Sequence, residues 1–151
     1  WSVWKKQHPD TTVLDMSRTS REYSSLFYRD PGRFVFGFEV DGQACILPMT
    51  GMMENPVHQF SVGSTALLAT FDRDGAVTHL FERQMEGRVL NFEQVDDLTM
   101  KDQQTGSRWN RLSGTYIEGD LHGKMLKQRV GIMSFRRAWQ NFHPDSQKIG
   151  F

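Results

Sequence analysis

Cysteine is almost absent from this sequence, because Cys45 is the single one among 151 residues. One cysteine excludes an internal disulfide and any metal cluster that several thiolates would hold. Cys45 stands in an alternating, strand-like stretch, which favours a small buried hydrophobic side chain. A reactive thiol would need an exposed and electropositive setting instead.

The sequence also lacks an excess of charge and a long apolar run. It has 18 basic and 18 acidic side chains, and therefore a net charge of zero. Nucleic-acid binding needs an excess of Lys and Arg that neutralises phosphates, so we do not expect nucleic acid to be a partner. No apolar run approaches the ~20 residues of a membrane-spanning helix, so we expect membrane association only through partners or through an anchor outside the chain.

The residues that are present predict a β-rich domain over residues 31–151. Strand-like runs alternate with turn signals every ~8–12 residues, which is typical of antiparallel β proteins. We predict a mainly antiparallel β roll or barrel-like domain with one or two short peripheral helices. The expected strands cover residues 33–40, 43–47, 65–71, 76–81, 88–92, 98–102, 107–112, 115–117 and 124–130. Gly51 and Pro56 indicate a loop over residues 49–56.

The two ends of the chain share one pattern. Trp4–Thr11 has Trp, His, Pro and Asp at the same spacing as Trp139–Ser146. A tandem array of modules explains such an echo, so we expect residues 1–30 to be the end of a preceding module or an N-terminal extension with a helix and a linker. Two similar helix ends that pack on one sheet are the alternative. In both copies the His-Pro-Asp run suits the end of a helix better than catalysis.

The segment before the second His-Pro-Asp run is predicted to be a short helix. Phe135, Ala138, Trp139 and Phe142 follow the spacing of one apolar helical stripe. Ser134 is the expected N-cap, and the proline that follows His143 is expected to stop the helix.

A tight turn near Asp72-Arg73-Asp74-Gly75 lies between two predicted strands. Asp72 and Asp74 are spaced as paired carboxylates could be for acid–base chemistry. Aspartate before glycine is also typical of hairpin turns, where the carboxylate accepts backbone N–H groups. We favour the turn.

The histidines near this turn offer a second chemistry. In the register that the turn sets, His79 lies opposite Thr70 across the hairpin. His58, Asp72 and His79 together could form a metal site of mixed ligands. Histidines with satisfied hydrogen bonds in a strand and a loop are the simpler interpretation.

The last third of the sequence is rich in basic residues, while most acidic residues come earlier. The basic residues that make it so include Arg108, Arg111, Lys124, Lys127, Arg129, Arg136 and Arg137. This order could give a dipolar surface that docks an oppositely charged protein. The alternative is an ordinary, mixed and solvated surface.

Several stretches, taken in order, resemble one known family. They are Phe36–Ala44 with Pro48, Phe81–Arg83, Gly87–Phe92, Thr105–Trp109 with Gly114, Leu121–Leu126, and Trp139 with His143–Asp145. Together they are similar to the domain-of-unknown-function 3179 family and cover residues 35–151. The resemblance implies a fold and the position of a site. It implies no reaction, because the activity of the family is unknown.

The family often has a Cys-x-x-Cys pair and an upstream His-Glu-x-Val-Asn-Asp pattern, and this sequence has neither. The residues at those positions are Asn55, Pro56, Gln59, Phe60, Asp72 and Gly75. The resemblance therefore implies a degenerate site. The candidate binding residues are Asn55, His58, Gln59, Asp72 and His79, and we expect no catalytic residue, no metal and no cofactor.

We therefore expect a non-catalytic binding or structural domain rather than an enzyme. It would be an extracytoplasmic module, periplasmic or at the cell surface, and an accessory or docking subunit of a larger protein assembly. The first alternative is a metal-binding or redox protein with a rearranged site near His58, Asp72 and His79. The second is a β-barrel that binds a small apolar ligand in its interior.

Overall fold

The computed structural model describes residue 5 and residues 8–12 and 23–151 of the chain. The helix expected over residues 1–7 thus lies mostly outside the described residues, as does much of the expected extension 1–30. The helices are α2 (Tyr23–Arg29), the 3-10 helix η1 (Pro31–Arg33), α3 (Met49–Glu54) and α4 (Arg136–Phe142). No helix in the described ranges is long and apolar enough to cross a bilayer.

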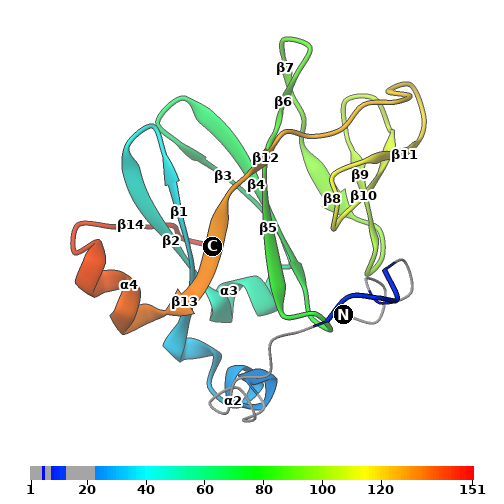
Figure 1. Cartoon of the computed structure of the whole chain (residues 1–151). Helices are drawn as coiled ribbons and strands as arrows, with labels where there is room; N and C mark the ends of the chain where they lie inside the picture. Colours follow the sequence, from blue (N-terminus) through cyan, green and yellow to red (C-terminus); the bar gives the residue numbers. More distant parts are fainter. Residues whose placement is uncertain (1–4, 6–7, 13–22) are drawn as a thin grey trace.

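The strands form three four-stranded sheets and one two-stranded ribbon (Figure 1). Sheet A has the order β13-β1-β2-β14, sheet B the order β12-β5-β4-β3, sheet D the order β11-β10-β9-β8, and the ribbon is β6-β7. All pairings are antiparallel except that of β14 with β2. The strands are β1 (Phe34–Val40), β2 (Gln43–Pro48), β3 (Val57–Val62), β4 (Thr65–Asp72), β5 (Val77–Glu82), β6 (Gln84–Met85), β7 (Arg88–Val89), β8 (Phe92–Gln94), β9 (Thr99–Asp102), β10 (Arg108–Asn110), β11 (Tyr116–Glu118), β12 (Gln128–Arg129), β13 (Gly131–Phe135) and β14 (Gln147–Lys148).

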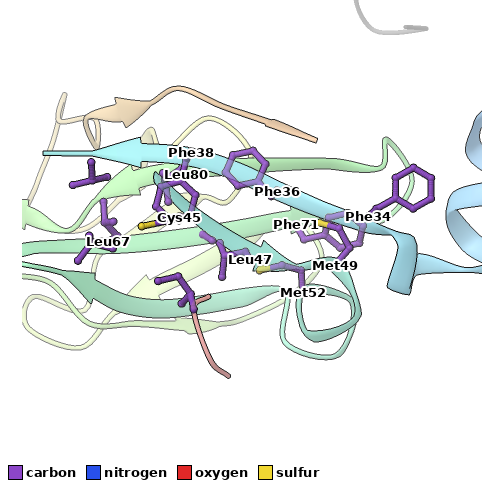
Figure 2. Close-up of a cluster of buried hydrophobic side chains, with 14 of the residues drawn as sticks. Phe34, Phe36, Phe38, Cys45, Leu47, Met49, Met52, Leu67, Phe71 and Leu80 are labelled. Atoms are coloured by element: carbon purple, nitrogen blue, oxygen red, sulfur yellow. The ribbon is translucent and has the colours of Figure 1, made fainter. Parts of the chain in front are cut away.

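The main core lies between sheet A and one face of sheet B. Alternate residues of β1, β2, β4 and β5 point into it, as the pleat of a strand requires. Its members include Phe36, Phe38, Leu47, Leu67 and Leu80, all nearly or fully buried (Figure 2). Side chains fill this interior and the sheets do not close into a barrel, so no interior ligand cavity of the kind the barrel alternative requires is present among the described residues.

Cys45 belongs to this main core and is fully buried. Burial raises the pKa of its thiol. The prediction of a small, buried, hydrophobic cysteine is therefore confirmed, and the raised pKa disfavours the thiolate, which is the reactive form.

A second core lies between the other face of sheet B and sheet D. Leu68 and Phe81 of sheet B meet Phe92 and Trp109 of sheet D there. The indole Nε1 of Trp109 donates to the buried carboxylate of Asp102 at 2.9 Å. A buried carboxylate needs such donors, and its partners hold the β9–β10 hairpin against the core.

Sheets A and B are joined through one continuous segment. β12 pairs with β5 and β13 pairs with β1, and Val130 alone separates the two strands. Gly131 follows, and a Cβ at this position would overlap the ring of Phe36. Glycine is therefore required where the chain crosses from one sheet to the other.

The outer face of sheet A is covered by α4. Trp139 is buried against Val35 and Ile46, and its ring lies over Gly37, where a Cβ would overlap it. The indole Nε1 donates to Ser146 Oγ at 2.8 Å, across the turn that ends the helix. Trp139 thus fixes both the helix and the turn that follows it.

The two echoed segments form the same turn. Ser146 N donates to His143 O at 3.2 Å, and Thr11 N donates to His8 O at 3.1 Å. His143 is the C-cap of α4 and stacks on Trp139 with ring centres 4.3 Å apart. The structural interpretation of the His-Pro-Asp run is confirmed for the second copy.

Three predictions of local structure were wrong. Residues 49–54 form α3 rather than a loop, because Met49 and Met52 lie one helical turn apart and both enter the main core. β3 and β13 were not predicted, and Ser134 lies inside β13 instead of capping α4. The apolar stripe of α4 is also not a buried face, since Trp139 is buried and Phe142 is 83% exposed.

Replacing Gly37 with alanine should destabilise the protein by about 1–3 kcal/mol, because the new methyl group would displace the Trp139 ring from a well-packed site. Urea unfolding of the two proteins measures this difference. Gly150→Ala is the matched control, since a Cβ at Gly150 meets no atom within 4 Å. Equal stability of the two variants would show that α4 is not held by this contact.

Candidate functional site

The candidate residues lie mainly on one face of sheet B, the face toward sheet D. Val57 pairs with Thr70, and Thr70 pairs with His79, as the hairpin register predicted. Asp72 lies two residues after Thr70 in β4 and therefore on the same face, because side chains alternate along a strand. One end of this face therefore brings Asp72 near His79, whereas Asn55 precedes β3 as the cap of α3.

Asp72 serves the turn between β4 and β5. Its carboxylate accepts the backbone N–H groups of Asp74 and Gly75, each at 3.1 Å. Both carboxylate oxygens are thus used to close the turn, and Asp74 is exposed. The turn interpretation is confirmed.

Asn55 ends α3 and is exposed. Its backbone N–H donates to Gly51 O at 2.8 Å, and it is the C-cap of the helix. Pro56 O, next in the chain, accepts the N–H of Phe71 at 2.9 Å, which holds the start of β3 beside β4. The side-chain Nδ2 of Asn55 also donates to Gly51 O, at 3.5 Å, so its recorded contacts are those of a helix cap.

His79 is half-buried on the same face, with its ring stacked on Phe81 at 6.2 Å between centres. Burial lowers the pKa of His79, and the negative charge of Asp72 acts in the opposite direction. Burial therefore favours the neutral form of the His79 imidazole.

Arg111 lies near Asp72 and His79, and these three side chains are called the polar cluster below. The sequence suggested only that Arg111 is a basic residue at the surface. It is 4% exposed, and its Nε and Nη1 atoms have no hydrogen-bond partner. Thr70 Oγ1 donates to Arg111 O at 2.7 Å. Burial lowers the pKa of the guanidinium, while Asp97, Asp72 and Asp96 raise it. The nearby carboxylates therefore help to keep this buried cation charged.

Gln59 lies further along the same face, and its side-chain amide forms two hydrogen bonds with the backbone of β8. Its Nε2 donates to Phe92 O at 2.9 Å, and its Oε1 accepts the N–H of Phe92 at 2.8 Å. The same oxygen accepts Arg83 Nη1 at 3.2 Å. This amide joins sheet B to sheet D as a neighbouring backbone would, so it is not free for a ligand.

Arg83 is the buried centre of that junction. Its Nε donates to Leu67 O at 3.0 Å, and its Nη1 donates to Leu90 O at 3.0 Å and to Asn91 Oδ1 at 2.7 Å. No carboxylate pairs with it among the described residues, and burial lowers its pKa. The Phe-Glu-Arg stretch indicated this position in the sequence, but no local pattern revealed that the arginine is buried.

His58 lies on the opposite face of sheet B. It pairs with Ala69, whose side chain belongs to the main core, whereas the next residue, Thr70, faces sheet D. Its ring stacks on Phe151 at 4.1 Å and on Phe60 at 5.5 Å between centres. Burial lowers its pKa, against a backbone hydrogen bond at Gly150 that raises it. The structure does not bring His58 to His79 and Asp72.

The cluster can bind or orient polar groups, but it does not combine the ligands of a metal centre. Within the described parts of the chain, no three His, Cys, Asp or Glu side chains are close enough to hold a metal ion. The mixed-ligand site of His58, Asp72 and His79 also fails because the sheet separates its two histidines.

Comparison with known proteins gives one match. A family model described as a protein of unknown function, DUF3179, matches residues 28–146. No curated protein and no solved structure matches the chain.

Gln59→Leu should lower the free energy of unfolding by roughly 2–3 kcal/mol, because it removes the hydrogen-bond partner of the backbone N–H and C=O of Phe92 and one of the acceptors of Arg83. Chemical unfolding measures the loss. Gln103→Leu is the control, since Gln103 is exposed and no hydrogen bond of its side chain is found among the described residues. A loss no larger than that of the control would contradict the role of Gln59 as a junction.

The free energy of unfolding should fall as the pH decreases from about 7 to about 5. Burial lowers the pKa values of both His58 and His79 in the folded chain. As the pH falls, the unfolded chain therefore binds protons at these histidines before the folded chain does, and a lower pH favours unfolding. The stabilisation is complete above the unfolded pKa of about 6.5 and is lost below it. The double variant H58Q/H79Q should flatten this dependence, measured by urea unfolding at several pH values. His122→Gln, at an exposed position, should retain it, and an unchanged slope in the double variant would refute the assignment.

Proposed function

The chain belongs to the DUF3179 family, whose description assigns no function, and we propose from its own residues that it is a non-catalytic binding or structural domain that docks onto protein partners in a larger assembly. The observation that supports this most is that two candidate site residues already hydrogen-bond to the backbone of the fold. The Asp72 carboxylate closes a turn, and the Gln59 amide bonds to the backbone of Phe92, so both side chains are needed for the structure. Chemistry at a site needs groups that are free to meet a substrate.

The outer surface supports the same proposal. Several large apolar side chains are exposed, among them Val130 at 87% and Phe142 at 83%. Single exposed apolar residues are ordinary, but Val130 and Ile132 are both exposed and line the same surface hollow beside Trp139. Exposed apolar side chains that lie together favour a surface for binding proteins.

A location outside the cytoplasm, at an accessory position in the assembly, is the remaining part of the proposal. Fractionation of the native cells tests the location directly. Recovery of the protein in the cytoplasmic fraction would refute that part and leave the docking role intact.

Two double variants separate a docking surface from a site. Arg136→Glu with Arg137→Glu changes the surface beside Phe135, and Asp72→Asn with His79→Gln changes the polar cluster. We expect the first pair to reduce recovery of partners from native extracts by about tenfold or more, and the second to leave it unchanged, because charge reversal at an interface repels the partner.

The opposite result would refute the proposal. If the cluster variant lost its partners while the surface variant kept them, the function would lie at Asp72 and His79. Elemental analysis of protein from its native source is the second control. One metal ion per chain that disappears with His79→Gln would favour the metal-binding alternative over a docking domain.

A further inference from the structure

Four of the eight basic residues in the range 102–151 are paired with acidic residues. The ion pairs are Lys124–Glu86 at 2.6 Å, Lys127–Glu82 at 3.0 Å, Arg129–Glu82 at 2.6 Å and Arg108–Glu118 at 3.3 Å. Arg111 is buried. The dipolar surface suggested by the sequence is therefore partly neutralised, and the basic residues left without an ion pair at the surface of this described range are Arg136, Arg137 and Lys148.

These two residues and Arg33 surround the arginine groove, a surface hollow of about 590 Å³ with Phe135 in its wall. The guanidinium of Arg33 lies 5.8 Å from the centre of the Phe135 ring. Arg136 Nε has no hydrogen-bond partner. Within the described ranges no ion pair involves any of the three arginines, and no acidic residue lines the groove. The groove thus presents an unpaired cationic rim around an aromatic side chain.

The chain itself has a complementary element, the acidic turn Glu93–Leu98, which consists of the end of β8 and the residues that connect it to β9. Glu93 and Asp97 are exposed, and so are Val95 at 48% and Leu98 at 58%. Asp96 shapes the turn, because its Oδ1 accepts the N–H groups of Leu98 and Thr99 at 2.8 and 2.7 Å. The turn therefore combines anionic and apolar side chains, as a ligand for the arginine groove requires.

The charges around the two elements have opposite signs. Residues 90–122 contain six acidic and three basic side chains, including Lys101 opposite Glu93 and Arg108 beside Asp96. Residues 127–151 contain five basic side chains and one acidic one. Lys127 and Arg129 are paired with Glu82, so the unpaired positive charge of residues 127–151 lies at Arg136, Arg137 and Lys148.

The two elements lie on opposite sides of the molecule. Figure 1 places β8 and β9 at the side away from α4, with sheet B between them. The turn of a folded chain is therefore far from its own groove, and only the turn of another copy can enter it.

We propose that copies of this domain associate head to tail, with the acidic turn of one copy in the arginine groove of the next. The inference rests on the proposed docking function and names a second copy as the partner. Such a contact joins two different surfaces, so it builds rings or open chains rather than a symmetric dimer. Exposed ion pairs are screened by salt, so the association should be weak and salt-sensitive.

Sedimentation velocity of the purified full chain tests the proposal. The average mass should rise with protein concentration at low salt and return to that of the monomer at high salt. The groove variant Arg136→Glu/Arg137→Glu and the turn variant Glu93→Lys/Asp97→Lys should each lower self-association by about tenfold or more. Asp96 is left intact because the turn needs it.

An equimolar mixture of the two variants is the decisive measurement. The turn variant has a native groove, which accepts the native acidic turn of the groove variant. The groove variant has an acidic groove, which accepts the basic turn of the turn variant. Association should therefore return in the mixture, although each variant alone stays monomeric. Arg73→Glu/Arg88→Glu is the control with the same change in charge at exposed positions elsewhere, and it should associate as the native chain does.

A native chain that stays monomeric at every concentration and salt would overturn the proposal, and so would a mixture that fails to associate. Thermal unfolding of each variant checks that it folds, and Arg136→Gln/Arg137→Gln replaces the groove variant if charge reversal prevents folding. A monomeric chain that still loses its native partners with the groove variant would show that the docking function holds and that the partner is a different protein.

Discussion

The buried guanidinium of Arg83 is the interaction on which the arrangement of the sheets depends. It donates to the backbone of β4 and to the segment that leads into β8, and it holds the amide of Gln59 in place. The cation is satisfied by neutral oxygens rather than by a carboxylate. Hydrogen bonds are directional, so those of Arg83 hold sheet D against sheet B and also set its orientation. Removing one partner of such a buried network costs more than the mean value of a hydrogen bond.

The candidate site residues obey the same requirement that buried polar groups have hydrogen-bond partners. A buried or half-buried carboxylate or amide needs partners, and here the partners are backbone groups of the fold itself. Asp72 and Gln59 have become parts of a turn and of a junction between sheets. His58 lies in an aromatic stack on the other side of the sheet. The candidate positions thus support the scaffold, and they do not form one polar centre.

Local patterns predicted the hairpins well, because a turn such as Asp41-Gly42 or Asp74-Gly75 and the alternation of its strands lie within a few residues. The opposition of Thr70 and His79 followed from this information alone. α3 was missed because glycine and proline beside Met49 and Met52 resemble a loop, and the helix exists only because both methionines enter the main core. β13 was missed since its partner β1 is far away in the sequence. The burial of Arg83 and Arg111 likewise depends on distant strands, which no local pattern contains.

The crossing at Val130 determines how the protein can unfold. The chain forms β12, the edge strand of sheet B, just before Val130 and β13, the edge strand of sheet A, just after it. Neither edge strand can therefore detach without displacing the other. The two sheets and the main core therefore form one cooperative unit. Sheet D is attached through the second core and the Arg83 junction, and it is free to open as a smaller unit of lower stability. Slow amide exchange should thus coincide across sheets A and B, with faster exchange confined to the region that bears the acidic turn.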